Sequence, residues 1–441
     1  MRENEQKLFS ADYVLLMTST MGISFVTYFF FSSLSLFAET LTGTVAFAGY
    51  MSLAYSATAL LTRPLSGILS DRKGRVKTLV FGAALSTVSC VLYSFATGLA
   101  MYNLMLGLVL LIAIRVVNGV GMGFNMTSAG AAVADIVPKE RLAEGIGLYG
   151  IAGTIAQAVG PLIALAIVGN GELSNFHTLF YVSTAFCGVS LICGCFIKYE
   201  RMRKKEQALK TEQPEYDAGI TARKSDAVSG TPGSELIEQN GQAEPVEPEE
   251  KTFLGFDRSM LGPAVVTLVY FFGISSIMTF MTLYGKNLGF QVGYLGWFFF
   301  ASAAGVLLSR VFFGRIADRR GADVIIIPGF VLIVACLVAI SFISSLPVFI
   351  LLGLPYGIAS GAIGPNINAL MFKRCSPKRR GTVAAAYSMA IDVGITLGAP
   401  ILGWVADLSG FRLVYLLSAA LAAIALVIYI FYVSDKRRIR V

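Results

Sequence analysis

Long apolar runs separated by short polar segments follow one another along most of the chain, and this pattern predicts membrane-spanning helices. A helix needs about 20 predominantly apolar residues to cross the hydrocarbon core of a bilayer. Six such runs precede a long polar segment, and six more follow it. The spans are predicted over residues 9–37, 44–69, 78–97, 104–131, 141–168, 177–197, 260–283, 292–314, 323–343, 346–371, 381–405 and 411–434. The expected fold class is an all-α integral membrane protein with 12 transmembrane helices in two six-helix bundles.

The polar segment between the two sets, residues 198–256, differs in composition from the rest of the chain. It is rich in Glu, Lys, Gln, Pro and Gly, begins with the basic stretch RMRKK and ends with the acidic stretch EPVEPEE. Such a segment has too few apolar residues to order itself by burying them. We therefore predict an N-terminal bundle over 1–197, a disordered cytoplasmic linker over 198–256 and a C-terminal bundle over 257–441.

Composition and charge support a membrane protein rather than a nucleic-acid-binding one. The 441 residues are 55% hydrophobic and only 14% charged, and the mean hydropathy is +0.70. The net charge of +8 comes from Lys and Arg that cluster in short segments between apolar runs. Basic residues concentrate on the cytoplasmic side of membrane proteins. We expect both termini in the cytoplasm, a multi-pass location in the inner or plasma membrane, and no nucleic-acid partner.

The chain offers little for a metal centre, a disulfide framework or an enzyme. Its six cysteines fall inside or at the ends of apolar runs, and it has one histidine, His177. A membrane enzyme would need a cluster of His, Asp or Glu at an interface, so an integral-membrane enzyme is a distant alternative. No GxxxxGK[ST] loop is present to bind a nucleotide phosphate. We expect no cofactor and no metal.

One charged phrase occurs twice. Residues 63–75 read RPLSGILSDRKGR, and residues 310–322 read RVFFGRIADRRGA. Aligning the phrases pairs Arg63 with Arg310, Gly67 with Gly314, Asp71 with Asp318, Arg72 with Arg319, and Gly74 with Gly321. In the predicted topology both copies are cytoplasmic. The two halves are therefore expected to be parallel repeats, related by an axis along the membrane normal.

The stretch GILSDRKGRVK at 67–77 resembles the signature between the second and third helices of the major facilitator superfamily. The resemblance covers essentially the whole chain apart from the linker. Arg115-Val-Val-Asn118-Gly119 in the fourth span is similar to a second motif of that family. The fifth span resembles the drug:proton antiporter group through Gly150, Gly153, Gly160 and Pro161, although Ala164 and Leu165 replace the paired glycines usual there.

The resemblance implies a gate at the cytoplasmic side. In it, Asp71 would face the positive N-terminal end of the eleventh span, and Arg75 would pair with Asp135 at the end of the fourth. The alternative is a solvated turn that only obeys the charge rule for orientation. The predicted gating residues are Gly67, Asp71, Arg72, Gly74, Arg75, Asp135, Gly314, Asp318, Arg319 and Gly321.

Two charges lie deep inside spans and have no charged counterpart in the other half. A charge at a helix centre costs about 2.5 to 3.5 kcal/mol on insertion scales, which makes such residues functional candidates. Arg115 lies about 17 Å into its span, and Asp392 about 18 Å into its own. Arg115 either orients an anionic substrate, sets the proton affinity of an acid, or is a packing arginine. Asp392 either couples transport to protons or locks the two halves together, with Arg63 as its partner. For Arg63 and Arg310 we expect snorkelling to the cytoplasmic interface.

A central cavity is expected between the first, fourth, seventh and tenth spans. Each of its polar residues could instead form an interhelical hydrogen bond. As a set they describe a neutral, aromatic pocket with one arginine, which favours an uncharged, zwitterionic or anionic substrate. The predicted cavity residues are Thr20, Ser24, Thr27, Tyr28, Arg115, Asn118, Asn125, Tyr270, Ser275, Thr279, Tyr356 and Asn366.

These features predict a secondary active transporter that works by rocker-switch alternating access. We expect a proton-coupled exporter, an antiporter, of a small organic molecule such as a drug or metabolite. Its partners would be that substrate, protons and the lipid bilayer, and it would function as a monomer. The alternative is a proton symporter or facilitator that imports a small nutrient.

Overall fold

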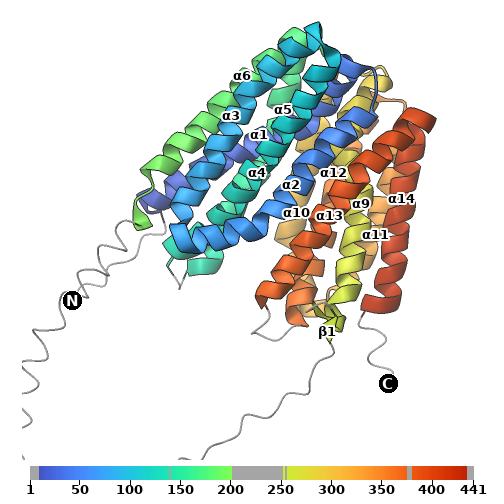
Figure 1. The fold of residues 1–441 in the computed structure, drawn as a ribbon. Coiled ribbons are helices and arrows are strands. Elements are labelled where there is room, and N and C mark those ends of the chain that lie inside the picture. Colours follow the sequence, from blue (N-terminus) through green and yellow to red (C-terminus); the bar gives the residue numbers. More distant parts are fainter. Residues whose placement is uncertain (1–8, 139–140, 201–251, 254–255, 375–379, 435–441) are drawn as a thin grey trace, which may run out of the picture. The chain divides into compact units, whose positions relative to one another are not determined.

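The computed structural model describes residues 9–138, 141–200, 252–253, 256–374 and 380–434. These residues form twelve long helices, six on each side of the linker, as predicted (Figure 1). Their bounds are α1 (Ala11–Thr42), α2 (Ala46–Lys73), α3 (Arg75–Tyr102), α4 (Leu104–Ile136), α5 (Leu142–Val168), α6 (Leu173–Phe196), α9 (Arg258–Asn287), α10 (Val292–Arg320), α11 (Asp323–Ser341), α12 (Leu346–Lys373), α13 (Arg380–Ser409) and α14 (Phe411–Ile428), which continues into the π-helical turn η3 (Tyr429–Val433).

The linker contributes two short strands, β1 (Thr252–Phe253) and β2 (Phe256–Asp257), which pair antiparallel. Contacts divide the chain into one unit of Met1–Ile197 with Arg258–Val441, and a second of Lys198–Asp257. Most of the predicted disordered segment, residues 201–251, lies outside the described residues. The disorder of the linker and the separation of the two bundles as domains stay predictions.

Within the described residues, eleven helices are long and apolar enough to cross a membrane. The remaining one is α2, the helix that carries the first charged phrase. It is rich in Ser, Thr and Tyr and ends in Asp71, Arg72 and Lys73. The predicted span over 44–69 therefore forms a helix but is less apolar than the others. Asp71, Arg72 and Lys73, which lay beyond the predicted span, belong to the last turn of this helix.

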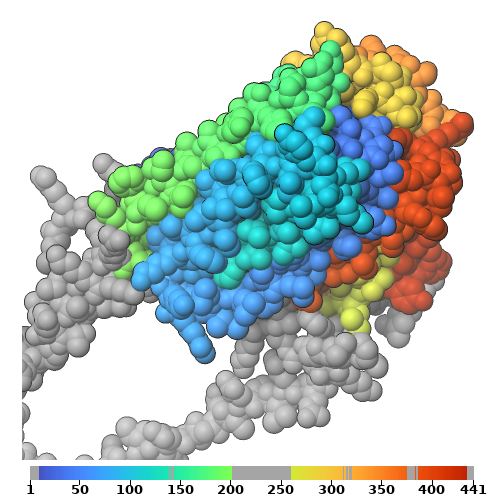
Figure 2. All heavy atoms as spheres, turned by 45° about the horizontal axis from the view of Figure 1, so that its top comes forward, coloured from blue at the N-terminus to red at the C-terminus, as the bar shows by residue number. Residues whose placement is uncertain are grey.

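The two halves meet mainly along two pairs of helices, α2 with α13 and α5 with α10, and α1 also contacts α9. Small residues allow close approach in both pairs. A Cβ at Gly49 of α2 would lie 2.7 Å from Cα of Pro400, and one at Gly296 of α10 would lie 2.9 Å from Cα of Leu162. Figure 2 shows the N-terminal half, in blue to green, packed directly against the C-terminal half on the face in view.

Candidate functional site

A cavity of about 340 Å³ lies at the contact between the halves, and we call it the main cavity. This volume is within the range typical of small-molecule sites. Its walls come from α1, α2, α4 and α5 of the N-terminal half and from α13 of the C-terminal half. The lining residues are Ser24, Thr27, Tyr28, Phe31, Tyr55, Ser56, Ala59, Arg63, Met122, Met126, Gly153, Asp392 and Ile395.

An ion pair joins the two halves in the wall of the main cavity. Nη1 of Arg63, on α2, lies 2.5 Å from Oδ2 of Asp392, on α13. The Asp392 side chain is 16% exposed and the Arg63 side chain 38%. The expectation that Arg63 snorkels to the membrane surface is therefore wrong, because the carboxylate on the opposite half is near enough to hold its guanidinium.

The repeat places a similar contact between the other pair of helices, with different chemistry. Arg310 on α10 is the counterpart of Arg63, and its Nη1 donates to Oγ1 of Thr154 on α5 at 3.2 Å. The halves therefore share an arginine at this level, but in the described part of the chain only Arg63 of these two forms an ion pair with an acid.

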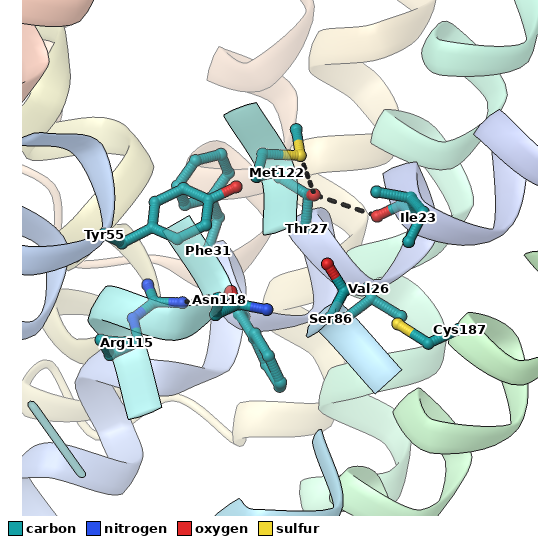
Figure 3. A pocket seen from close by; sticks show the side chains of 11 residues that line it. Ile23, Val26, Thr27, Phe31, Tyr55, Ser86, Arg115, Asn118, Met122 and Cys187 are labelled. Carbon is teal, nitrogen blue, oxygen red and sulfur yellow. Dashed lines mark hydrogen bonds between the residues drawn. The ribbon is translucent and has the colours of Figure 1, made fainter. Parts of the chain in front are cut away.

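Arg115 borders a second, smaller cavity of about 10 Å³, which we call the Arg115 cavity (Figure 3). It shares Thr27, Phe31, Tyr55 and Met122 with the main cavity, so the two adjoin. This volume holds about one water molecule. The complete lining is Ile23, Val26, Thr27, Phe30, Phe31, Tyr55, Ser86, Arg115, Asn118, Met122 and Cys187.

Of the predicted cavity residues, five reach one of these two cavities: Ser24, Thr27, Tyr28, Arg115 and Asn118. The others are buried elsewhere in the helix bundle. Thr20 donates to the carbonyl of Leu16, and Asn125 to that of Leu79 on α3. None of the predicted residues of α9 and α12 is among the described lining residues of either cavity. These are Tyr270, Ser275, Thr279, Tyr356 and Asn366.

Sequence reasoning missed the contribution of α2 to the main cavity. Tyr55, Ala59 and Arg63 are spaced by four residues, so they lie on one face of that helix. This spacing is visible in the sequence, but an arginine at its end is equally compatible with snorkelling to the membrane surface, so it did not show that this face meets the other half.

The residues of the predicted gate are only partly brought together. Arg75 pairs with Asp135 at 2.6 Å, as the resemblance implies, and also donates to the carbonyl of Ala131. Asp71 and Arg72 are exposed. The expected contact of Asp71 with the start of the eleventh span falls beside residues 375–379, outside the described residues.

The glycines of the gate differ in their surroundings. Gly74 and Gly321 have φ of 105° and 90°, a backbone region that favours glycine. Around Gly67, no atom lies within 4 Å of where a Cβ would stand. In the second copy, Gly314, Asp318 and Arg319 lie within α10, but the structure does not describe the surroundings of Gly314 or the side chains of Asp318 and Arg319.

The helix-5 motif contacts α1 of its own half and α10 of the other half. Gly153 lines the main cavity, and there is open space around it and around Gly150. A Cβ at Gly160 would lie 3.0 Å from Cβ of Tyr28 on α1. The carbonyl oxygen of Pro161 is 3.1 Å from the Cβ position of Gly296 on α10, so this part of the motif permits close packing.

A second set of contacts joins the halves at the far end of α2, and the sequence did not reveal it. Oδ1 and Oδ2 of Asp407, near the end of α13, accept the backbone N–H groups of Val45 and Ala46 at 2.8 and 2.7 Å. Nearby, Nζ of Lys286 on α9 lies 2.7 Å from Oε2 of Glu39 on α1. We call this the Asp407 end of the molecule, and the opposite end of α2 the Asp71 end.

Twelve long helices in two halves, eleven of them apolar enough to cross a membrane, with a cavity of ligand size and an ion pair between the halves, are typical of a multi-pass membrane transport protein. The chain belongs to the Major Facilitator Superfamily, whose sequence model matches residues 15–254 and 263–440. The family that the sequence motifs resemble is thereby confirmed.

The relatives found by sequence include one protein named for export and others named for multidrug resistance. The staphylopine export protein of Staphylococcus aureus is 23% identical over 380 residues, which cover 85% of this chain and 84% of that protein. Multidrug resistance protein MdtG of Serratia proteamaculans is 25% identical, with 88% and 85% covered. Among solved structures, a D-xylose-proton symporter matches with a TM-score of 0.70 at 15% identity, covering 96% of this chain and 98% of that one, which shows the shared fold.

Proposed function

We propose that this protein is a proton-coupled exporter, an antiporter of a small organic molecule, in the plasma membrane. The two halves would pivot about the main cavity and open it alternately to each side. Both termini would lie in the cytoplasm, and one chain would be sufficient for transport.

The observation that carries this proposal is the ion pair between Arg63 and Asp392. It lies in the wall of the main cavity and joins α2 of one half to α13 of the other. Asp392 is the one acidic residue among the described residues that line this cavity. A proton on Asp392 removes its charge and therefore the attraction to Arg63. Protonation would then be coupled to how the two halves are held together.

The proton gradient supplies enough free energy for useful export. One elementary charge moving through 100 mV yields about 2.3 kcal/mol. A tenfold concentration ratio costs about 1.4 kcal/mol. One proton per cycle therefore supports a gradient of about fiftyfold at that potential. The names of the staphylopine export protein and of MdtG support the outward direction for this chain.

The test uses everted membrane vesicles whose lumen is acidified. We expect the wild-type chain to accumulate a substrate in the lumen, and Asp392→Asn to abolish this uptake while substrate binding remains measurable. Glu172→Gln is the matched control, because Glu172 is an exposed acid at the start of α6. Unchanged pH dependence of transport in Asp392→Asn would rule out this coupling role.

A proton symporter that imports a nutrient is the second candidate. Ala164 and Leu165 replace the paired glycines of the antiporter motif, and both are fully buried. Accumulation of substrate by intact cells, increased by external acid, would favour this candidate over export.

A further inference from the structure

Arg115 is the most deeply buried cation that the structure describes, at 2% exposed. In the described part of the chain, no carboxylate forms an ion pair with it. Arg63, by contrast, is held by Asp392. A buried charge is costly unless it is paired and hydrogen-bonded. The position of Arg115 therefore needs an explanation beyond packing.

The hydrogen bonds of Arg115 do not compensate its charge. A guanidinium has five N–H donors. Here Nε donates to the carbonyl of Met51 at 3.3 Å, and Nη1 to Oδ1 of Asn118 at 3.4 Å. Both distances are longer than the usual range for N–H···O bonds. The acceptors are neutral, so the positive charge stays available to an anion.

Aromatic rings fix the guanidinium at the edge of the Arg115 cavity. Its carbon lies 4.5 Å from the ring centre of Tyr55 and 5.8 Å from that of Phe30. In Figure 3 the Arg115 side chain lies beside Asn118 and near Tyr55, with Ser86 across the cavity. Cation–π contacts orient a guanidinium but leave its in-plane N–H groups able to donate.

We propose that Arg115 binds a carboxylate of the transported molecule, so that the substrate is an organic monoanion with an apolar or aromatic body. This inference rests on the proposed transport function and names the substrate class of the same site. The carboxylate occupies the Arg115 cavity beside Asn118 and Ser86, and the apolar body lies in the main cavity against Phe31, Tyr28 and Met126.

The surroundings favour a carboxylate over a phosphate or a cation. A single guanidinium matches one negative charge and the planar, two-oxygen geometry of a carboxylate. A phosphate carries more charge than one buried arginine balances. An organic cation would be repelled by Arg115, and the one acid of the main cavity, among its described lining residues, is already paired with Arg63.

The small volume of the Arg115 cavity has a structural consequence. About 10 Å³ is less than a carboxylate requires. Tyr55 and Phe31 line both cavities, so their side chains must turn aside when the carboxylate enters. Substrate binding is then linked to a rearrangement between α1 and α2.

The proposal also separates the substrate charge from the proton site. The carboxylate binds on α4, whereas the ion pair of Asp392 joins α2 and α13. Outward movement of an anion and inward movement of a proton transfer charge in the same direction. Each cycle of a one-proton antiporter would therefore move two charges across the membrane.

The test measures thermal stabilisation of the purified full chain by aromatic monocarboxylates and by the primary amide of each. We expect carboxylates to raise the melting temperature and the paired amides to have no effect. Arg115→Gln should weaken carboxylate binding by about tenfold or more, the loss expected when a charge-assisted hydrogen bond is removed. Arg115→Lys, which keeps the charge but not the fork geometry, should give an intermediate affinity.

Arg412→Gln is the matched control. Arg412 also stacks on an aromatic ring, 4.1 Å from the centre of Phe342, but it lines neither cavity. Carboxylate affinity should be unchanged in this variant. If Arg115→Gln does not fold, the comparison of carboxylates with amides on the wild-type chain decides the question alone.

Three outcomes overturn the inference: no carboxylate stabilises the wild-type chain at millimolar concentration, amides bind as well as carboxylates, or Arg115→Gln binds carboxylates normally. Proton-driven export of neutral molecules only would leave the proposed function standing and remove this inference. Carboxylate binding that depends on Arg115, without proton-coupled export, would leave this inference standing and remove the proposed function.

Discussion

The two ends of the α2–α13 pair are held in different ways. At the Asp407 end, described contacts cross from one half to the other: Asp407 accepts two N–H groups at the start of α2, and Lys286 pairs with Glu39. At the Asp71 end, the described ion pair of Arg75 with Asp135 stays within the N-terminal half, and Asp71 is exposed. With both termini in the cytoplasm, as proposed, the end where the described contacts cross between the halves is the external one.

This difference shows that one kind of contact, a carboxylate of one half at the start of a helix in the other half, can join the halves at either end. The family resemblance implied a carboxylate, Asp71, at the end of α2 that faces the start of the eleventh span. The structure shows the converse contact at the opposite end, where a carboxylate near the end of α13 caps the start of α2. The first N–H groups of a helix lack partners within it and carry partial positive charge. Val45 at the N-cap provides no side-chain acceptor, so Asp407 fills this role from the other half.

The largest effect on transport is expected when a covalent bridge holds the two halves together at the Asp407 end. The double variant Glu39→Cys with Lys286→Cys should be bridged by a short bifunctional methanethiosulfonate reagent, because the two long native side chains meet at 2.7 Å and the reagent replaces the length that the cysteines lack. A covalent bridge between the halves prevents the alternation that transport needs, so we expect nearly complete loss of transport. Reductant should restore it.

Each single cysteine variant, treated with the same bifunctional reagent, is the control for this bridge. Transport that continues at the normal rate after the bridge is shown to form would mean that the Asp407 end does not open during the cycle.

A smaller effect is expected when the bond to the helix start is weakened. Replacing a capping residue by Ala costs about 0.5 to 2 kcal/mol. Asp407→Ala should therefore shift the population toward opening at this end by a factor of about 2 to 30. Asp407→Asn should shift it less, because Asn also caps helices well.

The shift can be measured with Ser56→Cys, which places a reporter thiol in the main cavity, through its labelling from outside the cell by a membrane-impermeant thiol reagent. The reporter is combined in turn with the native aspartate, with Asp407→Asn and with Asp407→Ala. Equal labelling of the three chains would show that the cap does not control access.

The smallest effect should come from the Asp71 end. In this structure the Asp71 side chain is exposed, so Asp71→Asn should change the stability of the purified chain by no more than about 0.5 kcal/mol. Transport should nevertheless fall if Asp71 acts when the cytoplasmic side closes. A stability loss as large as that of Asp407→Ala, measured by thermal unfolding, would mean that both ends are tied at once.

The sequence was sufficient for the parts of the fold that depend on local pattern. The twelve helices, the repeat and the pairing of Arg75 with Asp135 follow from apolar length and from motifs. The depth of Arg115 and Asp392 follows from counting residues along a helix. Both residues border a cavity, although their roles stay proposals.

The face that each helix turns toward the cavities could not be predicted, because the rotation and tilt of a helix are set by packing against its neighbours. This explains why Tyr270 and Tyr356 lie away from both cavities while Tyr55 lines them. It also explains Arg63 and Arg310, which share a position in the repeat but meet different partners. The cap by Asp407 joins residues far apart in sequence and leaves no local signal.

The contact between Arg310 and Thr154 bears on ion stoichiometry. Gly153, the neighbour of Thr154, has open space where a side chain would project. An offset of 239 residues aligns Pro161 with Pro400 and thereby pairs Gly153 of the fifth helix with Asp392 of the eleventh. The repeat thus has open space for a side chain at the position of Gly153, next to the residue that Arg310 contacts, but among these two matched positions an acid stands only at Asp392. How many ions accompany each molecule of cargo would then be decided by a single side chain, while the surrounding scaffold stays the same.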